Sequence, residues 1–158
     1  MEKGRFIMVN GESLIPFRGT DSFVFYQNIE SAREILDLAK VGYTEELWES
    51  FSETVPNPWK VLVVEGIISL FFAKNDKLFK IVVCDNYEDC LQNGVRIGMS
   101  IDDAKKLDPT LSYSEWNEDY ESELGYWLED DVETKAVMSI SIFIKEALEE
   151  NTFDYCNW

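Results

Sequence analysis

The chain has 158 residues, with 14 basic side chains against 31 acidic ones and no histidine, which gives a net charge of −17. This charge disfavours direct binding to nucleic acid or to an anionic membrane surface, and it favours association with basic partners. Apolar residues make up 46% of the chain, enough for a folded core and unlike the composition of a disordered acidic tail.

Several protein classes are disfavoured by what the sequence lacks. Histidine, the commonest general base and zinc ligand, is absent. The three cysteines include no Cys-x-x-Cys pair, which favours a reduced compartment. No apolar run approaches the about 20 residues of a membrane helix, and the first residues lack the apolar core of a signal peptide. We therefore expect a cytoplasmic protein without membrane contact, and the length suits a single domain, 1–158, with halves 1–93 and 94–158.

The N-terminal region contains two short segments with strand patterns. Asn10-Gly11 between two apolar runs predicts a hairpin, because both residues tolerate positive φ, with 12–17 as its second strand. Residues 22–26 predict a further strand.

One helix and three apolar strands are predicted next. Ser31 with Glu34 predicts a capping box at a helix start, and Gly42 predicts the helix end. A further helical turn or two is expected from Thr44. Three uniformly apolar runs predict strands at 61–64, 67–73 and 78–84.

The second half repeats this order of elements. Ser100 followed by Asp103 predicts a helix start, and Pro109 ends that helix. Alternation then predicts strands at 111–116, 121–129 and 134–144. A helix followed by strands thus occurs twice, although the two sequences do not match at a fixed period. We expect an α+β fold: an antiparallel β-sheet with helices packed on one face, built from two halves of helix plus strands.

A binding face is predicted in the second half. Between Lys106 and Lys135 there is no basic residue, and nine carboxylates between 115 and 133 are interspersed with aromatic side chains. Aromatic anchors surrounded by carboxylates are typical of a surface that binds a basic protein. The residues predicted to bind the partner are Tyr113, Trp116, Glu118, Asp119, Tyr120, Glu121, Glu123, Trp127, Glu129, Asp130 and Asp131. Ser139 and Ser141 are expected on the same sheet face as Trp127. The alternatives that the acidity serves only solubility, and that half of these aromatics are core residues, stay open.

The sequence offers little chemistry for catalysis. Paired carboxylates are abundant, but acid–base catalysis needs a pocket that separates their pKa values, and no pattern indicates one. Gly94 and Gly98 lack the spacing and the Lys-Ser/Thr of a phosphate loop, and no calcium-loop pattern occurs. We expect no enzyme activity, no cofactor and no metal site.

Three segments resemble immunity proteins that accompany bacterial polymorphic and contact-dependent inhibition toxins. These are GIISLFFAKNDKLFKIVV (66–83), NGVRIGMSIDDAKKL (93–107) and KAVMSISIFI (135–144). The element G-M-S-x-x-x-A-K-x-L also resembles the helix entry of the beta-lactamase inhibitory protein-like fold. The resemblance covers about residues 60–145 and implies a non-catalytic inhibitor that binds a secreted toxin domain.

The leading functional prediction is an immunity protein that occludes one basic toxin domain, a nuclease in many such systems, at a 1:1 ratio. Direct nucleic-acid binding is not expected. A DNA-mimic inhibitor of a DNA-binding protein is the alternative, and a metal-dependent enzyme is a weaker one.

Overall fold

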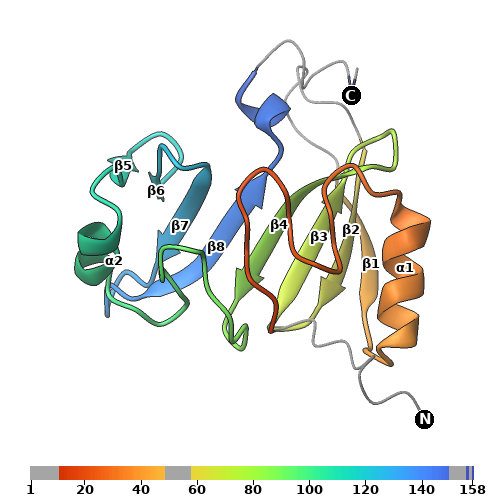
Figure 1. The fold of residues 1–158 in the computed structure, drawn as a ribbon, viewed down its shortest axis with the longest axis horizontal. Helices are drawn as coiled ribbons and strands as arrows, with labels where there is room; N and C mark the ends of the chain where they lie inside the picture. The colour runs from red at the N-terminus through yellow and green to blue at the C-terminus, as the bar shows by residue number, and fades with distance from the viewer. Residues whose placement is uncertain (1–10, 49–57, 150–155, 157) are drawn as a thin grey trace.

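The computed structural model describes residues 11–48, 58–149, 156 and 158. Its elements are α1 (Ile29–Leu38), β1 (Thr44–Trp48), β2 (Trp59–Val64), β3 (Ile68–Phe72), β4 (Leu78–Cys84), α2 (Ile101–Leu107), β5 (Ser112–Ser114), β6 (Asp119–Glu121), β7 (Tyr126–Asp130), β8 (Val137–Phe143) and a 3-10 helix at Lys145–Leu148. The strands form one antiparallel sheet in the order β1-β2-β3-β4-β8-β7-β6-β5. Figure 1 shows the two α-helices at opposite ends of this sheet. The predicted α+β class is confirmed.

The sheet consists of two four-stranded meanders that meet at its centre. Each meander follows one helix, α1 before β1 to β4 and α2 before β5 to β8. The last strands of the two meanders pair with each other, with Lys80 opposite Phe143 and Cys84 opposite Ser139. The order of helix plus strands noted in the sequence is therefore present in the structure.

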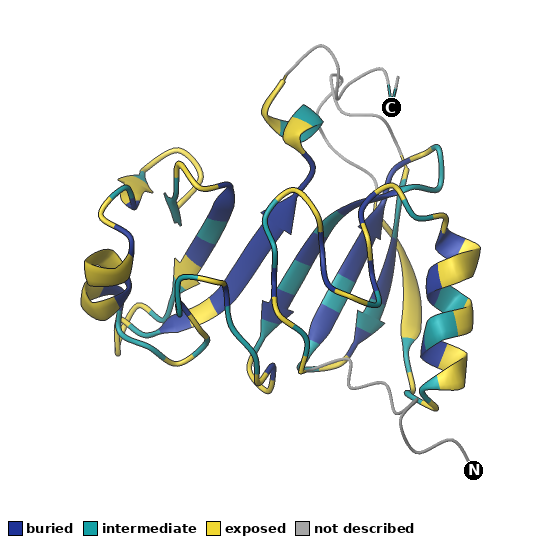
Figure 2. Cartoon of the chain, in the orientation of Figure 1, coloured by how far each residue is buried: buried dark blue, intermediate teal, exposed yellow. Residues whose placement is uncertain are grey.

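One face of the sheet carries the core. The register joins Leu62, Leu70, Ile81, Ile142 and Tyr126 across five strands, and each is at most 1% exposed. Figure 2 shows buried residues in each of the central strands, with residues of intermediate exposure between them. We call this side the helix face, because both helices pack on it.

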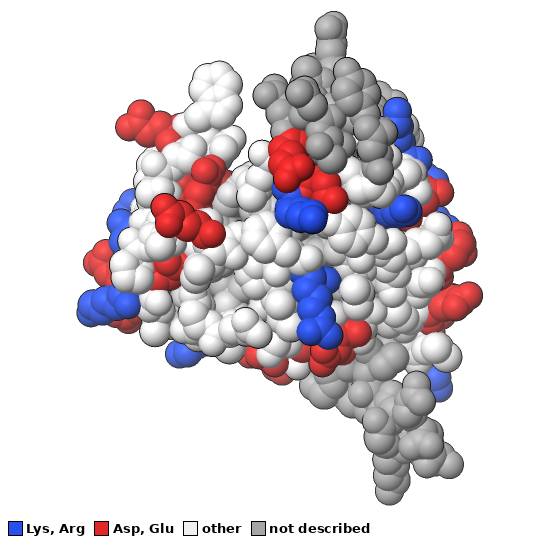
Figure 3. Space-filling model, turned by 45° about the horizontal axis from the view of Figure 1, so that its top comes forward, with Lys and Arg blue, Asp and Glu red and all other residues white. Residues whose placement is uncertain are grey.

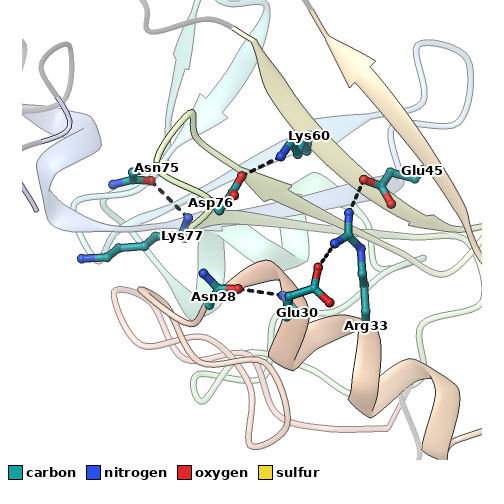
Figure 4. A network of polar contacts seen from close by, with 8 residues as sticks. All are labelled: Asn28, Glu30, Arg33, Glu45, Lys60, Asn75, Asp76 and Lys77. Atoms are coloured by element: carbon teal, nitrogen blue, oxygen red, sulfur yellow. Dashed lines mark hydrogen bonds and ion pairs between the residues drawn. The ribbon is translucent and has the colours of Figure 1, made fainter.

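Polar contacts fix α1 to the edge strand of the helix face (Figure 4). Arg33 donates hydrogen bonds to Glu30 on its own helix and to Glu45 on β1, which is opposite Leu62 in register. The helix begins at Ile29, because the Asn28 side chain accepts from the Glu30 N–H at 2.9 Å. The predicted cap at Ser31 is therefore three residues later than the observed cap at Asn28.

The second helix was located correctly. The Ser100 hydroxyl accepts from the Asp103 N–H at 3.1 Å, which satisfies one of the free donors of the first turn. The Lys105 ammonium lies 5.2 Å from the ring centroid of Tyr120, whose register partner Leu128 is on the helix face. The two helices thus cover the same side of the sheet.

The opposite side, which we call the back face, alternates with the core positions. Its register joins Val63, Ser69, Val82, Ser141 and Trp127, and all except Ser141 are only half-buried. Among the described residues, neither α-helix packs on this face. The expectation that Ser141 and Trp127 share a face is confirmed.

Some predicted elements were wrong. Thr44–Trp48 is an edge strand and not a helix, because pairing with β2 outweighs the helix preference of Glu and Leu. Residues 12–17 and 22–26 form isolated bridges and turns in place of strands, and Asn10 of the predicted hairpin lies outside the described residues. The predicted strand 121–129 is divided by a turn at 122–125, where Gly125 has a φ of +97°.

Gly19 tests the turn that precedes α1. A Cβ atom there would lie 2.2 Å from the Phe23 carbonyl oxygen, and φ is +112°. Gly19→Ala should lower the free energy of unfolding by more than about 1 kcal/mol in urea titrations. Gly42→Ala is the control, since it meets nothing within 4 Å; equal losses for the two variants would contradict this account.

Candidate functional site

Four of the eleven predicted partner-binding residues come together on the back face. Asp119 and Glu121 lie on β6, and Trp127 and Glu129 lie on the neighbouring strand β7. The register places Glu121 opposite Trp127, and Trp127 opposite Ser141 on β8. Ser139 and Ser141 of β8 lie on the same face and are 8% and 7% exposed.

The other seven predicted residues point elsewhere. Trp116 is 93% exposed in the turn between β5 and β6, and Glu118 follows it there with a φ of +56°. Tyr113 and Tyr120 lie on the helix-face side, with their ring centroids 5.0 Å apart. Glu123 lies in the turn before β7, and Asp130 and Asp131 lie at the far end of β7. The structure therefore brings four of the eleven predicted residues together on the back face and places the other seven in turns, at the end of β7 or on the helix-face side.

We define the acidic cluster as Asp119, Glu121 and Glu129. Glu121 accepts a hydrogen bond from the Asn117 amide at 2.8 Å, and Glu129 accepts one from the Ser139 hydroxyl at 3.2 Å. Among the described residues, no Lys or Arg lies within 4 Å of any of the three carboxylates. Within the described part of the chain, the acidic cluster therefore has no ion-pair partner.

Asp119 is the unusual member of the acidic cluster. It is 8% exposed, and its Oδ1 is buried without a hydrogen-bond partner. Burial raises the pKa of Asp119 to about 7, with further contributions from the charge of Glu121, a hydrogen bond with Glu121 and the charge of Glu129. Lys80 opposes this effect. Near neutral pH this carboxyl group exchanges its proton readily.

An aromatic hollow lies beside the acidic cluster. It has a volume of about 130 Å³ and is lined by Trp59, Phe79, Lys80, Trp127, Phe143 and Ala147. The Lys80 ammonium is 5.8 Å from the Trp127 ring centroid and 5.4 Å from that of Phe71. Burial lowers the pKa of Lys80, while the charges of Glu129 and Asp119 raise it. Lys80 was not among the residues predicted from the sequence, although a lysine within an apolar strand is a recognisable signal.

A buried carboxylate holds the β5–β7 segment in place. Asp108, at the end of α2, is 2% exposed and accepts hydrogen bonds from Tyr126, Ser122 and Thr110. Burial alone would raise the pKa of Asp108, but the hydrogen bonds from these three residues outweigh it and lower the pKa. The Asn93 amide donates to the Tyr126 hydroxyl at 3.1 Å and extends the network.

A second hollow, of about 450 Å³, lies on the helix-face side. Its lining is formed by Ile15, Pro16, Leu91, Gln92, Asn93, Leu124 and Tyr126. None of the predicted site residues borders it. Its walls are mostly apolar, and its polar groups are the amides of Gln92 and Asn93 and the Tyr126 hydroxyl, which already donates to Asp108.

Figure 3 shows acidic and basic side chains interspersed over the surface. The acidic side chains do not form one continuous patch in that view. Among the described residues, no group of three or more Cys, Asp or Glu side chains has the arrangement of a metal site. In the same part of the chain, no helix is both long and apolar enough to cross a bilayer.

No known protein family matches the sequence, and no curated protein matches it either. The fold is similar to the crystal structure of the uncharacterized protein YfeY from Escherichia coli, with a TM-score of 0.51 and 11% sequence identity. The match covers 84% of this chain and 97% of that one. At this identity the similarity concerns the fold alone.

Tyr126→Phe tests the network around Asp108. Removing the hydroxyl leaves Asp108 with one donor fewer and the Asn93 amide without this acceptor. We expect the free energy of unfolding to fall by about 1–3 kcal/mol in urea titrations, as for hydrogen bonds to a charged group. Tyr113→Phe is the matched control, because Tyr113 is 51% exposed; a loss of similar size there would argue against the network.

The raised pKa of Asp119 predicts a pH dependence of stability. The folded state keeps the proton up to about pH 7, whereas the unfolded chain releases it near the ordinary value of 3.8. Between these values the folded state binds more protons, so this group's contribution to stability falls as pH rises and is constant above pH 7.

Urea titrations of the unaltered chain and of Asp119→Asn between pH 4 and 8 measure this contribution. The difference in unfolding free energy between the two proteins should change with pH in favour of the variant as pH rises. A difference independent of pH would show that Asp119 titrates normally.

Proposed function

We propose that this chain is an immunity protein, a stoichiometric inhibitor that binds one basic toxin domain in the cytoplasm and occludes its active site. The observation that supports this most strongly is the back face, which lacks α-helical cover among the described residues and combines an unpaired acidic cluster with an aromatic hollow. We infer a nuclease as the toxin activity, because nuclease clefts are basic and complementary to this charge.

The helix face is a poor alternative for this role. Residues 14 to 36 contribute buried side chains to its core, among them Leu14, Phe23 and Leu36, each with no exposed surface. A partner would have to displace these segments to reach the sheet. The back face keeps half-buried side chains at Val63, Ser69 and Val82 and needs no such rearrangement.

The aromatic hollow supplies the apolar part of an interface. Binding free energy is concentrated in a few buried aromatic or Arg anchors at the centre of an interface, and charged groups around them chiefly set the association rate and the choice of partner. Trp127 borders both the hollow and the acidic cluster, which makes it the expected centre. The proposal assigns this chain no catalytic role, cofactor or metal.

The direct test uses a basic toxin domain sought among the products of the neighbouring genes. Purified toxin domain and this chain should form a 1:1 complex by light scattering, and the complex should lack the activity of the free domain. Recovery of DNA-handling proteins that are released by duplex DNA would instead support the DNA-mimic alternative. Undiminished toxin activity in the presence of excess chain would refute the proposal.

Trp127→Ala tests the position of the interface. The variant should weaken toxin binding by about 2 kcal/mol or more in calorimetric titrations, as truncation of a central aromatic anchor does. Because Trp127 packs on Phe143 at 4.8 Å, Glu129→Lys is a second variant that spares the packing and should also weaken binding. Glu34→Lys on the exposed side of α1 is the charge-matched control; equal effects of the two lysine variants would place the interface elsewhere.

A further inference from the structure

One oxygen atom of the acidic cluster is buried without a hydrogen-bond donor among the described residues. The Oδ1 atom of Asp119 is buried without a hydrogen-bond partner, in a side chain that is only 8% exposed. A buried polar atom without a partner is unfavourable, since its hydration is lost without replacement. Among the described residues no Lys or Arg pairs with Asp119, so this oxygen retains its capacity to accept a hydrogen bond from a ligand.

The neighbouring carboxylates determine which donor fits. Glu121 lies two residues along the same strand, and Glu129 is on the adjacent strand β7. Among the described residues, Glu121 accepts from the Asn117 amide and shares a hydrogen bond with Asp119, and Glu129 accepts from the Ser139 hydroxyl. A carboxylate has about four lone-pair sites, so both groups keep further acceptor capacity. A ligand for this cluster must therefore donate in more than one direction and carry positive charge.

We propose that Asp119, Glu121 and Glu129 form a receptor for one guanidinium group, the side chain of an arginine on the protein partner. A guanidinium presents five N–H donors in a planar fork and can bond two carboxylates at once, whereas an ammonium is a compact point charge. This inference rests on the proposed function for the source of the arginine, but the chemistry of the receptor can be tested without the partner.

In the free protein a bound proton neutralises the charge of Asp119, as a guanidinium would in the complex. The groups that act on Asp119 are the charges of Glu121, Glu129 and Lys80, whereas its register partner on β5, Ser114, is uncharged. Lys80 offsets one negative charge of the cluster without forming an ion pair. Binding of a guanidinium favours the ionised form of Asp119, so binding releases a proton near neutral pH and strengthens as pH rises.

The test titrates the full chain with N-acetyl-arginine N-methylamide at low ionic strength, followed by NMR. The indole N–H of Trp127 and the amides of β6 to β8 should shift saturably. Binding at pH 6 should be about tenfold weaker than at pH 8, because a group with a pKa of about 7 is then only about one-tenth ionised.

Two variants separate the receptor from general attraction to an acidic surface. Asp119→Asn should weaken binding at pH 8 by about tenfold or more and remove its pH dependence. Glu133→Gln removes one charge from the exposed turn between β7 and β8, outside the acidic cluster, and should leave binding unchanged. Circular dichroism confirms folding, and Glu129→Gln, at an exposed position, provides a second variant that should weaken binding.

The outcomes for the inference and for the proposed function are distinct. Equal binding by the unaltered chain and Asp119→Asn, an absence of pH dependence, or shifts outside β6 to β8 would each overturn the receptor. Saturable, pH-dependent binding of the arginine derivative, together with failure of the toxin domain to bind, would support the receptor and refute the proposed function. If the toxin domain binds Asp119→Asn and the unaltered chain with equal affinity, the proposed function is supported and the receptor is refuted.

Discussion

The pairing of β4 with β8 is the contact on which the rest of the architecture depends. Each meander alone is a four-stranded sheet with one helix, and only this pairing joins the two into a continuous surface. Lys80 from the first half comes to lie opposite Phe143 from the second. The aromatic hollow and the acidic cluster therefore become neighbours across the junction, and neither half could form that combination by itself.

Electrostatics distinguish the back face from an ordinary exposed sheet surface. Three carboxylates and one lysine lie there without an ion pair to any described residue, although acids and bases elsewhere on the protein, such as Lys60 and Asp76 at 2.9 Å, do pair. The chain has only 14 Lys and Arg residues for 31 Asp and Glu residues, so few basic side chains exist to neutralise such a cluster. The cluster keeps its attraction for an incoming cation, and Asp119 keeps a proton that it can give up.

The sequence was informative wherever local chemistry decides structure. The cap at Ser100 and the alternation through Ile140 and Ile142 depend on neighbouring residues, and both were predicted correctly. The sequence was misleading at Thr44–Trp48, where pairing with a distant strand determines the conformation. For the site, composition located the carboxylates but not Lys80, because strand order brings β4 close to β6 and β7, and no local pattern encodes strand order.

The two outermost strands limit how this sheet can associate with other chains. β5 is only three residues long, and β1 carries Glu45 and Glu46 on an exposed edge. Short and charged edges discourage an added strand, because pairing would bring few hydrogen bonds or would place acidic side chains beside the incoming chain. Growth of the sheet by edge-to-edge stacking is therefore opposed at both ends, and a protein with so broad an apolar sheet is protected against forming fibrils through its own edges.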